Sequence, residues 1–492
     1  MFLLGYLFMT IYLISLIVLS IYCLMQLILL FSYLFNIRVI PVKNYNSNTD
    51  NKQIPFITIQ LPLYNEKYVI NALLKSITNF EYPKDRFEIH ILDDSTDETT
   101  ELAENAVKHF TELGFNINLF HRKNRAGFKA GALRDATPFA NGQYIAIFDA
   151  DFLPYPDFLT KTLESFTNKN IGVVQTRWIH LNQKSSLLTE LQALQLNVHF
   201  TIEQSGRFLG DHLLQFNGTA GIWRKSCIED AGGWQPDTLT EDLDLSYRAQ
   251  LKGWKIVFME EVTAPAELPS EINGLKSQQF RWMKGGAETA LKLLPMIWTS
   301  DLKFFKKLMS TGHLLSSSIF IFIFLLGVSS IPLVLFIDTQ FRFSAHFSWF
   351  LLPTLILIIS YFIANVTVAW PKDNLLIRIF KFFILFPIFI AVSMSMALHN
   401  SVAVLQGLLG RKSSFVRTPK TGNLGQKQDN NRNEYFTTNF GAIVFIEGIL
   451  SIFFISAAIL GFYNGIFDFV ILHILLAFGY FYLFILSAKP HY

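Results

Sequence analysis

Long apolar segments occupy both ends of the chain, and polar residues are regularly interspersed only between them. Residues 2–35 carry no charge, and this run exceeds the roughly 20 apolar residues that a membrane-spanning helix needs. The first charges, Arg38 and Lys43, follow the run, whereas a cleaved signal peptide begins with positive charge. The pattern therefore predicts a retained transmembrane helix.

A second apolar region follows the middle of the chain. Its runs with the length of membrane spans are 311–337, 347–370, 439–461 and 464–487. The segment 376–409 is also apolar, but the loops on both sides of it are rich in Lys and Arg, which favours the cytoplasmic side. We therefore expect 376–409 to lie along the membrane interface or to re-enter the membrane. This gives five spans, with the N-terminus outside and the C-terminus inside.

The region between the apolar ends alternates short apolar runs with amphipathic stretches. Phe56–Leu63, Phe87–Leu92 and Tyr144–Phe148 have the pattern of buried strands that end in polar residues, and Thr96–Phe110 begins like a helix. The alternation predicts an α/β fold with a mostly parallel, doubly wound sheet. Since ligands bind beyond the carboxyl ends of such strands, we expect the polar residues there to share one binding edge.

The predicted organisation has seven parts. They are a transmembrane helix (1–37), a cytoplasmic α/β domain (54–267), interfacial helices (268–310), two spans (311–370), the interfacial or re-entrant segment (376–409), a cytoplasmic loop (410–438) and two further spans (439–488).

Composition supports a membrane protein and gives no sign of a nucleic-acid partner. Hydrophobic residues make up 51% of the 492 positions and charged residues 16%, which is too apolar for an ordinary soluble protein. A net charge of +3 is too small to indicate nucleic-acid binding. The separated cysteines Cys23 and Cys227 indicate neither a disulfide framework nor a zinc site, and so favour a reducing compartment for the α/β domain.

Acidic pairs follow two of the predicted strands. Asp149 and Asp151 are suited to hold Mg²⁺ or Mn²⁺, which bridges the phosphates of a nucleotide-sugar, although a solvated turn is the alternative. Asp93 and Asp94 are expected to accept hydrogen bonds from the base or ribose. The alternative there is helix capping by Asp94, Ser95 or Thr96.

Three further residues complete the predicted donor site. Tyr64 and Glu66 follow the first strand, at the same expected edge as the acidic pairs. Lys129 ends the basic stretch His121–Lys129 and is a candidate contact to the diphosphate, with an exposed charge run as the alternative.

A third acidic motif, Thr240-Glu241-Asp242, precedes a segment of helical spacing. Transfer of a sugar needs a nucleophilic hydroxyl, and a carboxylate within hydrogen-bond reach takes its proton. Asp242 is the predicted base. The alternative is that Glu241 and Asp242 are acids favoured by the positive end of a helix.

Two segments are predicted to contact the acceptor or the diphosphate. Gln278, Arg281 and Trp282 share one face of a helix, so the ring would stack on a sugar while the guanidinium pairs with phosphate. An amphipathic interfacial helix with an anchoring Trp is the alternative reading. The loop Phe216-Asn217-Gly218-Thr219-Ala220-Gly221 contains two glycines that permit close backbone approach.

Taken in order, D-D-S, D-A-D, T-E-D and Q-x-x-R-W followed by membrane spans resemble the membrane-embedded family 2 glycosyltransferases, which include cellulose, hyaluronan and mannan synthases. The resemblance implies a GT-A fold inserted between transmembrane helices, a divalent metal, inversion at the anomeric carbon and a β-linked product. It assigns nucleotide and metal binding to Asp93, Asp94, Asp149 and Asp151, and the base to Asp242. It assigns acceptor and diphosphate contacts to the Q-x-x-R-W residues and to Glu241.

Two finer similarities point within this family. The loop Phe216–Gly221 is most similar to that of the cellulose synthase-like mannan and glucan synthases. Phe415, Thr418 and Lys420 match the gating-loop pattern F-x-V-T-x-K of cellulose synthases, from which the chain departs at Arg417.

The sequence therefore predicts a processive hexosyltransferase that uses UDP-glucose or GDP-mannose and extrudes a polysaccharide through its own spans. One alternative is a non-processive enzyme that glycosylates a lipid such as ceramide or diacylglycerol. A non-catalytic membrane scaffold is a third reading, against which all three acidic motifs argue.

Overall fold

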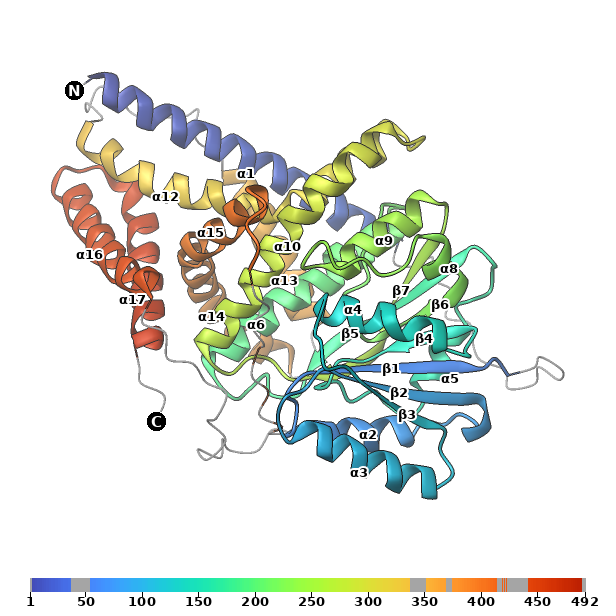
Figure 1. The fold of residues 1–492 in the computed structure, drawn as a ribbon. Coiled ribbons are helices and arrows are strands. Elements are labelled where there is room, and N and C mark those ends of the chain that lie inside the picture. Colours follow the sequence, from blue (N-terminus) through green and yellow to red (C-terminus); the bar gives the residue numbers. More distant parts are fainter. Residues whose placement is uncertain are drawn as a thin grey trace.

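The computed structural model describes residues 2–36, 54–336, 351–368, 374–413, 418, 420, 422 and 441–488. An α/β domain lies beside a group of long apolar helices that come from both ends of the chain (Figure 1). Helix α1 (Phe2–Asn36) packs against α12 (Ile319–Phe336), so the two apolar regions of the sequence form one membrane region.

The described residues of the α/β domain form a seven-stranded sheet. Its strands are β1 (Ile57–Leu63), β2 (Phe87–Asp93), β3 (Ile117–His121), β4 (Tyr144–Ile147), β5 (Ile171–His180), β6 (Gly221–Arg224) and β7 (Lys255–Ala266). They are ordered β3-β2-β1-β4-β6-β5-β7, and β6 runs antiparallel to both neighbours. The other strands run in one direction, so their carboxyl ends meet at one edge. The α/β fold predicted from the sequence is confirmed.

Helices cover both faces of this sheet, as a doubly wound fold requires. Helices α2 (Ile70–Thr78), α3 (Thr99–Glu112) and α5 (Phe158–Leu163) pack on one face, and α4 (Phe128–Ala136), α8 (Lys225–Asp230) and α9 (Glu241–Leu251) pack on the other. The central strands are buried on both faces and are mostly apolar, with Thr58, Gln60, Glu88 and His90 as buried polar exceptions. Helix α3 begins at Thr99 rather than at the predicted Thr96.

A set of helices connects the α/β domain to the membrane region. They are α6 (Leu187–Val198), a π-helix (His199–Gln204), α7 (Ser205–Leu209), the long α10 (Ile272–Thr299) and α11 (Phe304–Leu314). Helix α10 packs against α15 (Ala397–Leu408) and approaches α9, so it contacts both parts of the molecule.

Five helices among the described residues are long and apolar enough to cross a membrane. They are Leu3–Asn36, Ser316–Val334, Leu375–Ser395, Ala442–Tyr463 and Phe467–Ala488, which correspond to α1, α12, α14 (Leu375–Ser395), α16 (Ala442–Tyr463) and α17 (Val470–Ala488) with short extensions. The predicted span 347–370 contains the shorter apolar stretch Pro353–Thr367, formed by α13 (Leu351–Phe362) and a π-helical turn. The membrane region is thus multi-pass.

The segment 376–409 consists of α14 and α15, which meet near Met396. Residues on both sides of this pair contact the connecting helices: Asn365 accepts a hydrogen bond of 3.0 Å from Asn197 of α6, and the carbonyl of Arg411 accepts one from Lys284 of α10. Helix α14 is itself long and apolar enough to cross a membrane. The interfacial or re-entrant placement therefore stays a prediction.

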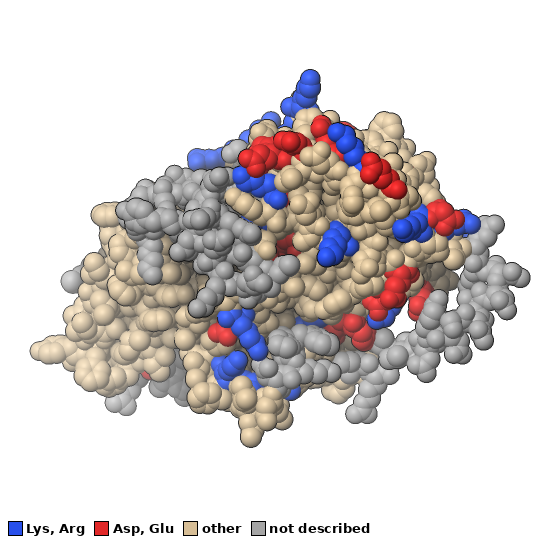
Figure 2. Space-filling model, turned by 90° about the horizontal axis from the view of Figure 1, so that it is seen from below, with Lys and Arg blue, Asp and Glu red and all other residues tan. Residues whose placement is uncertain are grey.

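Charge is distributed unevenly over the two parts. On the face shown in Figure 2, Lys, Arg, Asp and Glu gather over the α/β domain, while the lobe of apolar helices at the left is nearly uncharged. The nearly uncharged surface of the helical lobe is suited to contact with lipid rather than with water.

Candidate active site

The carboxyl-terminal edge of the sheet borders a cavity of about 610 Å³. Residues at or just after the ends of five strands line it: Tyr64 (β1), Asp94 (β2), Asp149 (β4), His180 (β5) and Glu267 (β7). This confirms that the polar groups at the strand ends share one edge, as the alternation of strands and helices predicted.

Most predicted site residues meet in this cavity. Those that line it are Tyr64, Glu66, Asp94, Lys129, Asp149, Asp151, Asn217, Gly218, Glu241, Asp242, Gln278, Arg281, Trp282, Thr418 and Lys420. Phe415 lies outside the described residues. Asp93, Phe216 and Thr219 do not line the cavity, and their roles differ from those expected.

Asp93 supports the site without reaching it. Its buried carboxylate accepts hydrogen bonds from the Thr100 hydroxyl (2.7 Å) and the Ser95 amide (3.0 Å), and lies 2.8 Å from Nδ1 of His121. These contacts fix the end of β2 against β3 and α3. The expected nucleotide contact by Asp93 is therefore corrected, because all access to its side chain is closed.

Phe216 and Thr219 also act from behind the cavity wall. Phe216 is fully buried and packs edge-on against Trp223 of β6, with ring centres 5.5 Å apart. The hydroxyl of Thr219 accepts a 2.8 Å hydrogen bond from the amide of Asp149. Both residues shape the loop that carries Asn217 and Gly218, so the expected acceptor contacts are corrected to positioning roles.

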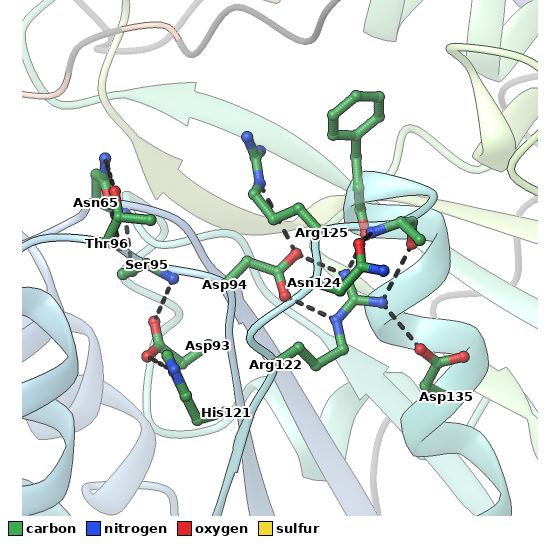
Figure 3. A network of polar contacts seen from close by, with 12 residues as sticks. Asn65, Asp93, Asp94, Ser95, Thr96, His121, Arg122, Asn124, Arg125 and Asp135 are labelled. Atoms are coloured by element: carbon green, nitrogen blue, oxygen red, sulfur yellow. Dashed lines mark hydrogen bonds and ion pairs between the residues drawn. The ribbon is translucent and has the colours of Figure 1, made fainter.

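Asp94 is held by an arginine that no sequence motif marks. Arg122 donates Nε to one oxygen of Asp94 (2.7 Å) and Nη2 to the other (2.6 Å), and Nη1 to Asp135 (2.9 Å) (Figure 3). Arg125 lies over the Tyr64 ring, with its guanidinium carbon 3.3 Å from the ring centre. In the sequence, the basic stretch His121–Lys129 was the only sign of these contacts. Arg122 and Arg125 of this stretch contribute to the site in addition to the predicted Lys129.

Ser95 and Thr96 tie two strand ends together. The Ser95 hydroxyl accepts a 2.8 Å hydrogen bond from the amide of Asn65, and Oδ1 of Asn65 accepts one of 2.9 Å from the amide of Thr96 (Figure 3). Helix α3 instead begins after Glu98, without a side-chain cap. The helix-capping alternative for this motif is therefore wrong, and the loops after β1 and β2 form one unit.

Lys129 stands at the start of α4 and points between carboxylates. Its ammonium donates to Oδ1 of Asp149 (2.5 Å) and to the carbonyl of Gly218 (2.8 Å). Burial opposes the charge, but the carboxylates of Asp149 and Glu241 outweigh it and raise the pKa of Lys129. It is therefore a fixed cation beside the acidic motif, which excludes an exposed charge run.

Asp149 and Asp151 form a donor set that fits a small divalent cation. Each carboxylate makes one ion pair of 2.5 Å, Asp149 with Lys129 and Asp151 with Lys420. Among the described residues no group of three His, Cys, Asp or Glu has metal-binding geometry. Two carboxylates nevertheless suit Mg²⁺ or Mn²⁺, which commonly take the rest of their ligands from substrate phosphates and water.

Asp242 lies on the first turn of α9, in the wall between the acidic motif and α10. Gly218 faces it with φ +80°, and a Cβ at this position would lie 3.0 Å from Oδ2 of Asp242. Burial raises the pKa of Asp242 to about 7, and the neighbouring charge of Glu241 adds to the effect. A helix N-terminus alone would lower this pKa, so the surroundings of Asp242 differ from those of an exposed first-turn acid.

Helix α10 presents Gln278, Arg281 and Trp282 to the cavity from one face, as their spacing predicted. One turn later, Gly285 packs so closely on Thr240 that a Cβ would lie 2.6 Å from its methyl carbon. The buried Lys284 of the same turn donates to the Ser413 hydroxyl (2.8 Å). Helix α10 thus holds both the loop of the base and the start of loop 410–438.

Other lining residues lie at the far end of the sheet, where no motif marks them. Trp178 and His180 are among the last residues of β5, and Glu267 follows β7. The strand β5 was not among those predicted from the sequence, so nothing indicated that its end faces the same cavity as Asp149.

Comparison with known proteins identifies the family to which the chain belongs. Residues 55–285 match the family described as Glycosyltransferase like family 2. Glucomannan 4-beta-mannosyltransferase 1 of Oryza sativa subsp. japonica is 33% identical over 404 residues, which cover 78% of this chain and 73% of that protein. Probable glucomannan 4-beta-mannosyltransferase 11 of Arabidopsis thaliana is 39% identical over 264 residues, covering 52% and 60%.

A solved structure supports the fold. The mannosyltransferase from Pyrobaculum calidifontis, in complex with GDP-Man and Mn²⁺, has a TM-score of 0.50 at 17% identity, covering 80% of this chain and 100% of that chain. The α/β domain therefore resembles GT-A glycosyltransferases. The chain belongs to the membrane-embedded family 2 glycosyltransferases, the superfamily of cellulose synthases and cellulose synthase-like mannan and glucan synthases, and is a hexosyltransferase.

Proposed function

We propose that the chain transfers mannose from GDP-mannose to the end of a growing β-linked polysaccharide, with inversion at the anomeric carbon. The names of its 4-beta-mannosyltransferase relatives support this donor, and UDP-glucose is the second donor that the motifs admit. The observation that carries the proposal is the place of Asp242. It lies in one cavity with the diphosphate-binding candidates Lys129 and Asp149 and with the acceptor helix α10.

The proposed step needs one base. Asp242 takes the proton of the acceptor hydroxyl as its oxygen forms a bond to the anomeric carbon. The bond from that carbon to the phosphate oxygen breaks, and the nucleoside diphosphate leaves with the electron pair. A carboxyl with a pKa of about 7 is well matched to this task near neutral pH. Lys129 and Arg281 are placed to stabilise the departing charge.

Asp149 and Asp151 would hold Mg²⁺ or Mn²⁺ in the donor complex. A bound ion supplies electrostatic stabilisation of the diphosphate leaving group. Lys129 and Lys420, which pair with these carboxylates and line the same cavity, would be available to contact the diphosphate.

A second cavity of about 40 Å³, which is too small for a sugar ring, lies among the helices that connect the α/β domain to the membrane region. It is lined from α6, α10, α12, α14 and α15. Gln195 and Gln279 line it, and their neighbours Leu196 and Gln278 line the large cavity. A polymer end that advances from Asp242 toward the membrane helices would pass from the large cavity toward the small one. The proposal places the α/β domain in the cytoplasm, where sugar nucleotides are made, and the protein in the plasma or inner membrane.

Membranes containing the protein, with Mg²⁺ or Mn²⁺ and either radiolabelled GDP-mannose or UDP-glucose, test this proposal. We expect label in a precipitable polymer that β-mannanase digests, and no label in membranes carrying Asp242→Asn. Polymer from UDP-glucose that β-glucanase digests would correct the sugar. Label found only in the organic phase would replace the polymer by a glycolipid.

A further inference from the structure

We propose that Trp178 and His180 form a binding subsite for the hydroxyl groups of a carbohydrate acceptor. The inference rests on the proposed function and deepens it, because it makes the acceptor a saccharide rather than a bare lipid. It concerns residues that none of the recognised motifs contains.

Strand order places these residues on the side of the cavity away from the nucleotide. The edge of the sheet runs from β3, β2 and β1, which end at Arg122, Asp94 and Tyr64, through β4 with Asp149, to β5 and β7. A donor held by the first three strands and the acidic motif leaves the ends of β5 and β7 for the acceptor. Trp178 is therefore on the acceptor side by topology alone.

Both side chains line the cavity, and each has a ring nitrogen without a protein partner. Nε1 of Trp178 and Nε2 of His180 have almost no accessible surface and make no hydrogen bond within the part of the chain that the structure describes. A buried polar atom that stays unsatisfied is destabilising. Sugar hydroxyls, which donate and accept, are suited to partner both nitrogens once a bound saccharide has moved the groups that now cover them.

The chemistry of the pair suits a neutral ligand. Burial, helped by the charge of Arg177, lowers the pKa of His180 to about 3, so the imidazole is uncharged at neutral pH. The Trp178 ring is held between Phe152 and Phe200, at centre distances of 5.3 and 5.4 Å. A fixed indole beside a neutral imidazole matches hydroxyl and C–H groups of a sugar better than a phosphate.

An unsatisfied indole by itself is not diagnostic, since Nε1 of Trp223 also lacks a partner among the described residues. Trp223 lies in the core under α8 and lines no part of the cavity. What distinguishes Trp178 is its place on the cavity wall together with His180. This contrast also supplies a matched control.

The test compares Trp178→Phe with Trp223→Phe, and His180→Phe with His180→Gln, in the full-length purified protein. Two quantities are measured with β-1,4-mannotetraose as the acceptor probe: its KM in transfer from GDP-mannose, and its direct binding to the GDP-loaded protein by saturation-transfer NMR. The KM for the donor is recorded in parallel, because a merely structural defect would change it as well.

We expect Trp178→Phe and His180→Phe to raise the acceptor KM about tenfold, the loss of one hydrogen bond, with the donor KM unchanged. Trp223→Phe should match the wild type, and His180→Gln should restore most of the affinity. Equal acceptor binding in Trp178→Phe, His180→Phe and Trp223→Phe would overturn the subsite. Failure of the wild type to form polymer while tetraose binding still depends on Trp178 would refute the proposed function and leave the subsite standing.

Discussion

The two halves of the cavity differ in how their polar groups are satisfied. At the ends of β1, β2 and β3, charges are paired closely: Arg122 holds both oxygens of Asp94, and Lys129 holds Asp149. At the end of β5, Trp178 and His180 are uncharged, and Nε1 of Trp178 and Nε2 of His180 have no hydrogen-bond partner among the described residues. Under the proposed function, charge gathers where the diphosphate would bind, and uncharged groups line the side assigned to the acceptor.

The halves also differ in what lies behind them. The donor half rests on the sheet core and on α4, within the α/β domain. The acceptor half is closed by α10, whose Lys276 reaches Glu447 of α16 (2.7 Å) and Ser487 of α17 (2.8 Å). Under the proposed function, acceptor recognition would rest on a helix fixed to the membrane helices, which suits a product that leaves through them.

The largest effect is expected where the halves meet. Asp242→Asn keeps the shape of the site but removes the proton acceptor, so turnover should fall by about 10³, within the range for a general base. Calorimetric titration with GDP should give an unchanged affinity. Asp157→Asn, which changes an exposed carboxylate outside the cavity, is the control. Retention of a third of the turnover in Asp242→Asn would remove Asp242 from the mechanism.

The next effect belongs to the donor half alone. Lys129→Met leaves Asp149 and Glu241 without their shared cation, so the affinity for GDP should fall by about 30-fold, the consequence of an unpaired charge worth roughly 2 kcal/mol. Tetraose binding measured by NMR should not change. A loss of both affinities would show that the halves are coupled and not separate.

The pH dependence of kcat/KM tests the role of Asp242, which lies where the two halves of the cavity meet. Asp242 must be ionised to accept a proton, and its pKa is raised to about 7, so kcat/KM should fall as the pH drops through 7 and be about tenfold lower at pH 6 than at pH 8. Glu241→Gln removes a charge that raises this pKa and should move the midpoint to lower pH. A profile that is flat from pH 8 to pH 5.5 would contradict this assignment.

The smallest effect is expected in the acceptor half. Trp282→Ala removes a ring on the cavity face of α10, and loss of stacking worth about 1 kcal/mol should raise the KM for β-1,4-mannotetraose about fivefold. Donor affinity should remain at the wild-type value, the mirror image of Lys129→Met. Weaker GDP binding in Trp282→Ala would instead place the ring beside the nucleotide.

The sequence predicted the parts of this site that follow local rules. Strand ends at Tyr64, Asp94 and Asp149 were visible because polar residues interrupt apolar runs, and Gln278 and Trp282 were visible through helical spacing. The three strands predicted from the sequence, β1, β2 and β4, were placed to within about one residue because most of their positions are apolar, whereas β3, β5, β6 and β7 were not predicted. Because these strands run in the same direction, the residues at their ends meet at one edge of the sheet.

Tertiary contacts decided what the sequence could not show. Asp93 and Asp94 are adjacent, chemically identical and both buried, yet only Asp94 lines the cavity. Arg122 and His180 gain their places only through pairing of distant strands. In the membrane region, hydropathy alone did not separate α14 from a span, and only the charge of the flanking loops led to the prediction of another placement.

The configuration of the first bond formed tests the central claim most directly. A single base between a bound donor and an incoming acceptor hydroxyl requires attack from the face opposite the leaving diphosphate. Proton NMR of the product made from α-linked GDP-mannose and β-1,4-mannotetraose should therefore show one new β-linked mannose. An α-linked residue would mean that the sugar passed through a second displacement, and would contradict Asp242 as the base of a one-step inversion.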